Sequence, residues 1–290
     1  MEGCVASSPP STSAGWWPRG ERGSCRWTER TVRLTVLGSG TAAPNRRRGA
    51  PGCLVEAGRE TLLVDCGAGT LDRLLRAGGD PNRIDRVLFT HHHLDHFGEI
   101  GHLLFAAGLP VHGRRKPLTL AGSGPLLASL RAFQMLFGHW LMPTGFSLKL
   151  HDLDEEPLVG EGIRVSGYAV DHIPASRALR LEEEGGAVLT LSGDTDLCDG
   201  VVTAARDADL FVCEASFPEG SKTPGHLVPS EAGALARRAG ARRLLLNHFY
   251  PECDQVDMAS PAAAAFGRPV ELAEDGMVVD ILPAAMKPAS

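Results

Sequence analysis

The chain has 290 residues, of which 43% are hydrophobic and 22% charged, so it is long enough to bury a globular core. Its formal net charge of −6 gives no overall attraction to nucleic acid, and any such binding would need a local basic patch. No apolar run approaches the roughly 20 residues of a membrane helix, which argues against a membrane protein.

The seven cysteines are scattered and form no Cys-x-x-Cys pair. This favours reduced thiols, and we expect a cytoplasmic protein. Residues 1–30 are rich in Pro, Ser, Gly and Arg, without a periodic apolar face or the apolar core of a signal peptide. We expect a disordered N-terminal tail over 1–30, or an overlong start. One domain should cover 31–283, and 284–290 should form a C-terminal tail.

From residue 31 onward, short β-rich runs alternate with helical patterns. Strands are predicted over 32–37, 53–57, 61–65, 86–90, 163–170, 178–183, 187–192, 209–213, 243–247 and 277–282. Helices are predicted over 70–77, 97–107, 124–137, 199–206, 229–239 and 259–266. The second and third strands, and the sixth and seventh, predict hairpins. We expect Ser230 to cap the clearest helix and Gly240 to close it. A mixed sheet system flanked by helices follows.

The run FTHHHLDHFGEI, residues 89–100, places four histidines and an aspartate at a predicted strand end. Side chains at i and i+2 of an extended segment face the same way, so His91 and His93 converge while His92 points away. Asp95 and His96 follow where the chain turns into a helix. This H-x-H-x-D-H pattern predicts a divalent metal site, whereas a polar histidine tract is the less favoured interpretation. Imidazole and carboxylate ligands suit zinc, with manganese or iron as alternatives.

Three further polar residues each follow a predicted apolar strand: His172 in DHIPAS, Asp194 in LSGDTD and His248 in NHFYP. One such residue alone would usually belong to a turn. Three strand exits that complement the first motif instead predict additional metal ligands.

The chain resembles the metallo-β-lactamase-fold hydrolase superfamily over residues 31–283, and within it the ribonuclease Z-like branch of phosphodiesterases. The resemblance is carried by LGSGTAAPNRRRGAPGCLVE, LLVDCGAGT, FTHHHLDH, DHIPASRALRLE, LSGDT, CEASF and GHLVPSEAGALARRAGARRLLLNHFYP. It implies an α/β fold, the four-layer αββα sandwich, with a two-zinc site at its open edge. By this resemblance, one metal is held by His91, His93 and His172, the other by Asp95, His96 and His248, and Asp194 bridges both.

The same resemblance implies a phosphodiesterase that acts on RNA ends, short oligonucleotides or cyclic nucleotides, in which the metals activate water for attack on phosphorus. His226 in TPGHLVPS is the candidate proton donor to the leaving group, and Glu214 in VCEASF would orient it and raise its pKa. Asp95 counts with these two as catalytic. A plain loop histidine is the competing interpretation of His226. Asp65 in LLVDCG is expected either to accept a hydrogen bond from a metal-bound histidine or to be a turn residue.

Two basic clusters are candidate phosphate contacts, although charged runs on loops are usually only solvated. They are Arg46, Arg47 and Arg48, and Arg114, Arg115 and Lys116. The LGSGT segment lacks the full G-x-G-x-x-G spacing, so no dinucleotide site is predicted.

Two departures from ribonuclease Z bear on the substrate. Only residues 173–193 separate His172 from Asp194, which leaves no room for the long arm that grips tRNA. Ala178, Leu179 and Arg180 stand where those members carry Gly-Tyr-Arg. With the acidic net charge, this favours a small phosphodiester, such as a short oligonucleotide or cyclic nucleotide.

Other functions stay open. A carbon-ester hydrolase of the same fold (lactonase, thioesterase or β-lactamase) is one alternative, and a non-catalytic scaffold is another. A screen of phosphodiesters, lactones and β-lactams with zinc or manganese distinguishes them. Candidate partners are the phosphodiester or ester substrate, nucleic acid and a second copy of the chain in a homodimer.

Overall fold

The structure is a computed structural model that describes residues 31–109 and 114–284. The predicted N-terminal tail lies outside the described residues, and so does the predicted C-terminal tail apart from residue 284.

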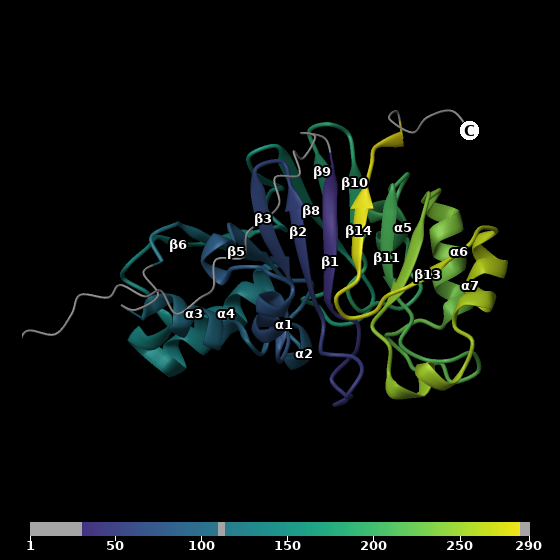
Figure 1. Cartoon of the computed structure of the whole chain (residues 1–290), viewed down its shortest axis with the longest axis horizontal. Helices are drawn as coiled ribbons and strands as arrows, with labels where there is room; N and C mark the ends of the chain where they lie inside the picture. Colours follow the sequence, from purple (N-terminus) through teal and green to yellow (C-terminus); the bar gives the residue numbers. More distant parts are fainter. Residues whose placement is uncertain (1–30, 110–113, 285–290) are drawn as a thin grey trace, which may run out of the picture.

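Two seven-stranded sheets face each other (Figure 1). The first has the order β14 (Val278–Ile281), β1 (Val32–Gly38), β2 (Gly52–Ala57), β3 (Glu60–Val64), β4 (Arg86–Leu88), β5 (Leu118–Gly122) and β6 (Leu148–Asp152). The second has the order β13 (Glu271–Leu272), β12 (Leu244–Asn247), β11 (Leu210–Glu214), β10 (Val188–Leu191), β9 (Arg177–Glu183), β8 (Ile163–Ala169) and β7 (Leu158–Val159).

Helices cover the outer face of each sheet (Figure 1). Those beside the first sheet are α1 (Thr70–Arg76), α2 (Leu94–Phe97), α3 (Ile100–Gly108) and α4 (Gly124–Phe137). Those beside the second are α5 (Asp199–Ala204), α6 (Pro229–Ala239) and α7 (Ala259–Phe266). Short 3₁₀ turns are η1 (Pro81–Arg83), η2 (Gly138–Leu141) and η3 (Pro251–Gln255). The expected αββα sandwich is confirmed.

Strand alternation builds three apolar layers. In β3, Leu62 and Val64 join the core between the sheets, whereas Leu63 packs beneath the helices of the first sheet. Neighbouring side chains of a strand point to opposite faces, so a strand buried on both faces is apolar throughout. The helices contribute one apolar side each, as Leu71 and Leu74 do from α1. No helix of the described part of the chain is long and apolar enough to span a membrane.

The predicted hairpins β2–β3 and β9–β10 are confirmed as antiparallel pairs. The sequence prediction missed β5, β6, β7 and β13. Its helix over 97–107 matches α3 but includes only the last residue of α2. The N-cap assignment was also wrong. Val228 occupies the N-cap of α6 with Pro229 as the first helical residue, and Glu231 accepts a hydrogen bond from the Val228 amide. Proline at the first position and glutamate at the third are the signals that fix this start.

Candidate metal centre

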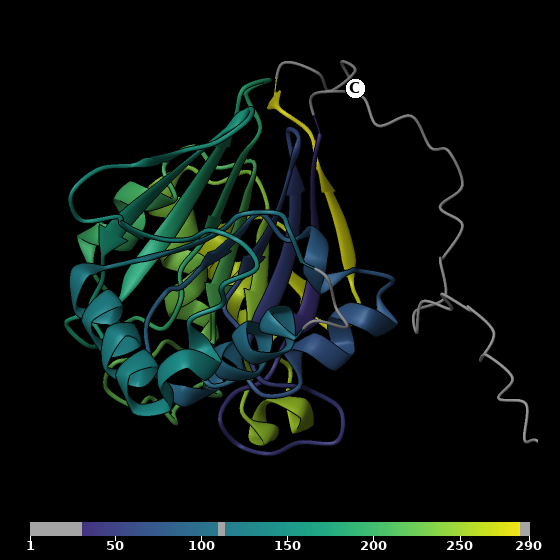
Figure 2. The same ribbon diagram turned by 90° about the vertical axis from the view of Figure 1, so that its left-hand side faces the viewer.

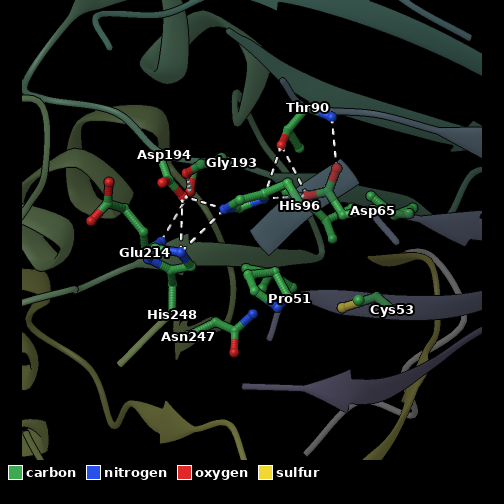
Figure 3. Close-up of a pocket in the computed structure, with 15 residues that line it drawn as sticks. Pro51, Cys53, Asp65, Thr90, His96, Gly193, Asp194, Glu214, Asn247 and His248 are labelled. Carbon is green, nitrogen blue, oxygen red and sulfur yellow. Dashed lines mark hydrogen bonds and ion pairs between the residues drawn. The ribbon is translucent and has the colours of Figure 1, made fainter. Parts of the chain in front are cut away.

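Strand direction gathers the polar residues at one edge of the sandwich. Strands β10, β11 and β12 are mutually parallel, and β8 points the same way because two antiparallel pairings separate it from β10. Their carboxyl ends therefore meet at one edge. In the first sheet, the parallel strands β3 and β4 also end there. Figure 3 shows His96, Asp194 and His248 pointing toward one another, beside a cavity of about 40 Å³.

The backbone turns sharply at the two strand exits that carry Asp65 and His248. Their φ angles are 58° and 63°, a region that non-glycine residues seldom adopt. Gly193, just before Asp194, has φ 59°, and a Cβ there would lie 2.7 Å from Thr90 Cβ. Such strain is characteristic of positions where the surrounding structure fixes a side chain for function.

The first group of potential ligand atoms surrounds one carboxylate oxygen of Asp194. The Nδ1 atom of His93 lies 3.0 Å from His91 Nε2 and 3.1 Å from His172 Nε2. Asp194 Oδ2 lies 3.7 Å from His91 Nε2 and 3.8 Å from His172 Nε2. All four ligand atoms lie within 4.8 Å of one another.

The second group faces the other oxygen of the same carboxylate. Asp194 Oδ1 lies 3.2 Å from His96 Nε2 and 3.4 Å from His248 Nε2. Asp95 Oδ2 lies 3.7 Å from His96 Nε2 and 3.5 Å from His248 Nε2. Asp194 thus presents one carboxylate oxygen to each group.

These residues fit divalent metal ions. Four ligands about 2.0–2.2 Å from a zinc ion in tetrahedral geometry stand roughly 3.3–3.6 Å apart, close to the separations in both groups. Asp194 Oδ1 is buried and accepts no hydrogen bond from the described residues. A buried carboxylate oxygen without a partner is costly, and a cation would satisfy it.

Hydrogen bonds on the far side of four imidazoles orient their rings. The Nδ1 atoms face Thr90 Oγ1 at 3.1 Å for His91, Asp65 Oδ2 at 2.8 Å for His96, Gly225 O at 2.9 Å for His172 and Ser216 Oγ at 2.9 Å for His248. The Asp65 carboxylate and the Gly225 carbonyl can only accept, so Nδ1 of His96 and of His172 donates, and Nε2 of each ring is the nitrogen that faces the centre. The Nε2 atoms of His96 and His248 lie only 3.2 Å apart, a separation that suits two ligands of one cation.

Burial acts on the histidines of the first group in the direction that metal binding needs. It is the largest cause that lowers the pKa of His91, His93 and His172 below the ordinary value. Neutral imidazole is the form that binds metals. His92 is only half-buried, and its Nδ1 lies 3.4 Å from Ser129 Oγ on α4, outside both groups.

Glu214 is buried and connects three loops of the site. Its Oε1 accepts hydrogen bonds from the Thr195 amide at 2.7 Å and His226 Nδ1 at 3.1 Å. Its Oε2 accepts from the Ser216 hydroxyl at 2.5 Å, the Ser216 amide at 3.3 Å and the Leu227 amide at 3.1 Å. This carboxylate therefore fixes the loop of Asp194, the loop of His226 and, through Ser216, the ring of His248.

The expected contact between Glu214 and His226 is present. Burial alone lowers the pKa of His226, but the hydrogen bond and negative charge of Glu214 outweigh burial and raise it above the ordinary value. A ring nitrogen of His226 also lies within 4.8 Å of ligand atoms on Asp194 and His248. Because His226 Nδ1 is hydrogen-bonded to Glu214, Nε2 is the ring nitrogen that remains available to a ligand.

Asp65 supports the site as the sequence suggested. Its carboxylate accepts hydrogen bonds from His96 Nδ1, from the Thr90 amide at 2.8 Å and from the Thr90 hydroxyl at 2.9 Å (Figure 3). Sequence reasoning missed Thr90 and Ser216. The Thr90 hydroxyl lies between the carboxylate of Asp65 and the ring of His91, and the Ser216 hydroxyl lies between the carboxylate of Glu214 and the ring of His248. No sequence pattern signals these contacts.

Two of the proposed phosphate contacts have structural roles instead. Arg48 is buried, donates to Asp254 and Ala273 O, and lies 4.5 Å above the ring of Phe249. It joins the loop after β1 to η3, and Figure 2 shows both at the lower end of the sandwich. Arg114 is buried too, and donates to the carbonyls of Pro81, Ile84 and Pro117.

Residues 53–226 match the family model of the metallo-beta-lactamase superfamily. The chain belongs to this superfamily. Among its superfamily relatives, an uncharacterised protein of Mycobacterium tuberculosis is 35% identical over 83% of this chain and 89% of the relative. Ribonuclease Z of Myxococcus xanthus is 28% identical over 86% of this chain and 98% of the relative. The crystal structure of the metallo-beta-lactamase fold protein YhfI from Bacillus subtilis superposes with a TM-score of 0.73 and 27% identity, covering 87% of this chain and 99% of that chain.

Proposed function

We propose that this superfamily member is a metal-dependent phosphodiesterase of the ribonuclease Z-like type that acts on small phosphodiesters. In this proposal, His91, His93 and His172 hold one zinc ion, Asp95, His96 and His248 hold a second, and Asp194 bridges them. When bound, such ions supply an activated water nucleophile and neutralise charge that develops on the substrate.

The observation that carries the proposal is the pair of His226 and Glu214 beside the metal groups. Glu214 Oε1 holds His226 Nδ1 at 3.1 Å and stabilises the protonated ring, so Nε2 is a proton donor on the side of the site. Cleavage of an alkyl phosphodiester expels a poor alkoxide leaving group, which needs a proton as the bond breaks. A positioned acid is therefore useful for this reaction.

The connection between His172 and Asp194 supports a small substrate. Residues 173–193 contain β9, β10 and short turns, and no long excursion leaves the sandwich there. Nucleic acid bound by a protruding arm would need such a segment. Together with the net charge of −6, this favours a mononucleotide-sized or short oligonucleotide diester over a large RNA.

The test is a rate comparison across diesters whose leaving groups rise in pKa, for the wild-type protein and His226→Ala. The substitution should lower turnover of an alkyl or ribose diester by about 10²–10⁴-fold, the usual contribution of general acid catalysis. Bis(nitrophenyl) phosphate should be largely spared, because nitrophenolate leaves without a proton. Metal content should stay at the wild-type level.

One common loss for every leaving group, or a loss of metal, would assign His226 to binding and refute its role as an acid. Lactones and β-lactams belong in the same screen. Turnover of these compounds without any diester hydrolysis would identify a carbon-ester hydrolase instead.

A further inference from the structure

Four aromatic rings beside the metal groups form two stacked pairs. Tyr250 stacks on Phe217 with ring centroids 4.7 Å apart and an interplanar angle of 16°, and His226 lies parallel to His248 at 6.0 Å and 14°. The pairs meet edge to face: Phe217 lies 5.7 Å from His226 at 71°, and Tyr250 lies 6.5 Å from His248 at 88°. Tyr250 is therefore packed on the side of the site that carries the proposed acid.

Main-chain hydrogen bonds hold Tyr250 in this position. The positive φ of His248 turns the chain at the end of β12, and the next amide, of Phe249, donates to Ser39 O at 3.0 Å. The Tyr250 amide donates to Ser216 O at 3.2 Å, and its carbonyl accepts from Cys253 at 3.0 Å. The ring is thus placed by the same turn that presents His248.

The hydroxyl of Tyr250 has no hydrogen-bond partner among the described residues, although the residue is half-buried. Tyrosine hydroxyls normally find a partner when their rings are packed in this way. The Tyr250 ring lies 6.5 Å from that of His248, at the edge of the second group of potential ligand atoms.

We infer that Tyr250 is a further substrate-contacting residue, whose hydroxyl donates a hydrogen bond to a non-bridging oxygen of the bound phosphoryl group. The inference rests on the proposed function and adds a contact to it. Tyr250 transfers no proton in this role. Its contribution is the same for every leaving group, because the oxygens it contacts are common to all phosphodiesters. That behaviour separates it from His226.

The test compares Tyr250→Phe with Tyr168→Phe, a matched change at the one other tyrosine of the chain, which lies in β8. Loss of a hydrogen bond to a charged oxygen should lower kcat/KM about 10-fold or more, by a common factor across the diester series. Calorimetry with inorganic phosphate and the metal-loaded protein should show a similar loss of affinity. Tyr168→Phe should match the wild type in both measurements, and metal content and melting temperature should be unchanged in both variants.

The two measurements keep this inference separate from the proposed function. If the wild type hydrolyses no diester but loses phosphate affinity on Tyr250→Phe, the proposed function fails and the contact stands. Unchanged phosphate affinity in Tyr250→Phe overturns the inference, whatever the rates show. Loss of metal from this variant also overturns it, because Tyr250 would then act by holding His248.

Discussion

Glu214→Gln is the substitution whose cost follows most directly from the structure. A glutamine side chain fills the same space but replaces one carboxylate oxygen with an NH₂ group, which cannot accept a hydrogen bond. If NH₂ replaces Oε1, the Thr195 amide and His226 lose their acceptor. If it replaces Oε2, Ser216 and the Leu227 amide lose theirs. At least two donors at this buried carboxylate are left unpaired in either orientation.

Each buried unpaired donor costs about 1–3 kcal/mol, so we expect a loss of about 2–6 kcal/mol in the free energy of unfolding. For a domain of this size, that corresponds to a melting temperature lower by roughly 10 °C. Thermal unfolding of metal-loaded protein measures it, with Glu155→Gln at an exposed position as the matched control. A shift no larger than that of the control would refute the role of Glu214 as the link between the loops.

The remaining predictions concern metal content, measured by elemental analysis after reconstitution. Asp194→Ala should leave fewer than one ion per chain, because each metal group loses an oxygen ligand. His92→Ala should keep the wild-type metal content. A loss of metal equal to that of His93→Ala would contradict the assignment of His91 and His93, and not His92, as ligands. Gly67→Ala should lower metal content and stability, because the added Cβ would stand 1.8 Å from the carbonyl oxygen of Asp95 and displace α2. Gly145→Ala is the control and should be tolerated, because the nearest atom to its Cβ would be 3.6 Å away.

Sequence patterns located the parts of the site that lie at strand ends. A histidine or aspartate directly after an apolar run, as at His172, Asp194 and His248, can be read from the chain because strand and exit are neighbours in sequence. Ser216 and Tyr250 could not be found this way. Their importance comes from contacts with His248 and Phe217, and side-chain contact between separate loops leaves no periodic signal.

The missed elements have similar physical reasons. In β5 the run LTLAG has only five residues, so its alternation of apolar and polar side chains is too short to mark a strand. Arg48 and Arg114 were candidate substrate contacts because they lie in basic runs. Each is instead buried against an aromatic ring and backbone carbonyls, and the sequence gives no sign of which arginine in a run turns inward.

The pairing of β1 with β14 has a consequence for biosynthesis. Strand β1 is the first of the described strands, yet one of its two neighbours in the sheet is β14, the last of them, with Val32 opposite Ile281. The proposed ligands are also far apart in the sequence, since His91 precedes His248 by more than half of the chain length. A ribosome that has released the chain only as far as β6 exposes β1 with one edge unpaired, together with half of each proposed ligand set. We therefore expect metal loading to follow emergence of His248 from the ribosome, and nascent chains to depend on protection of that edge until β14 emerges.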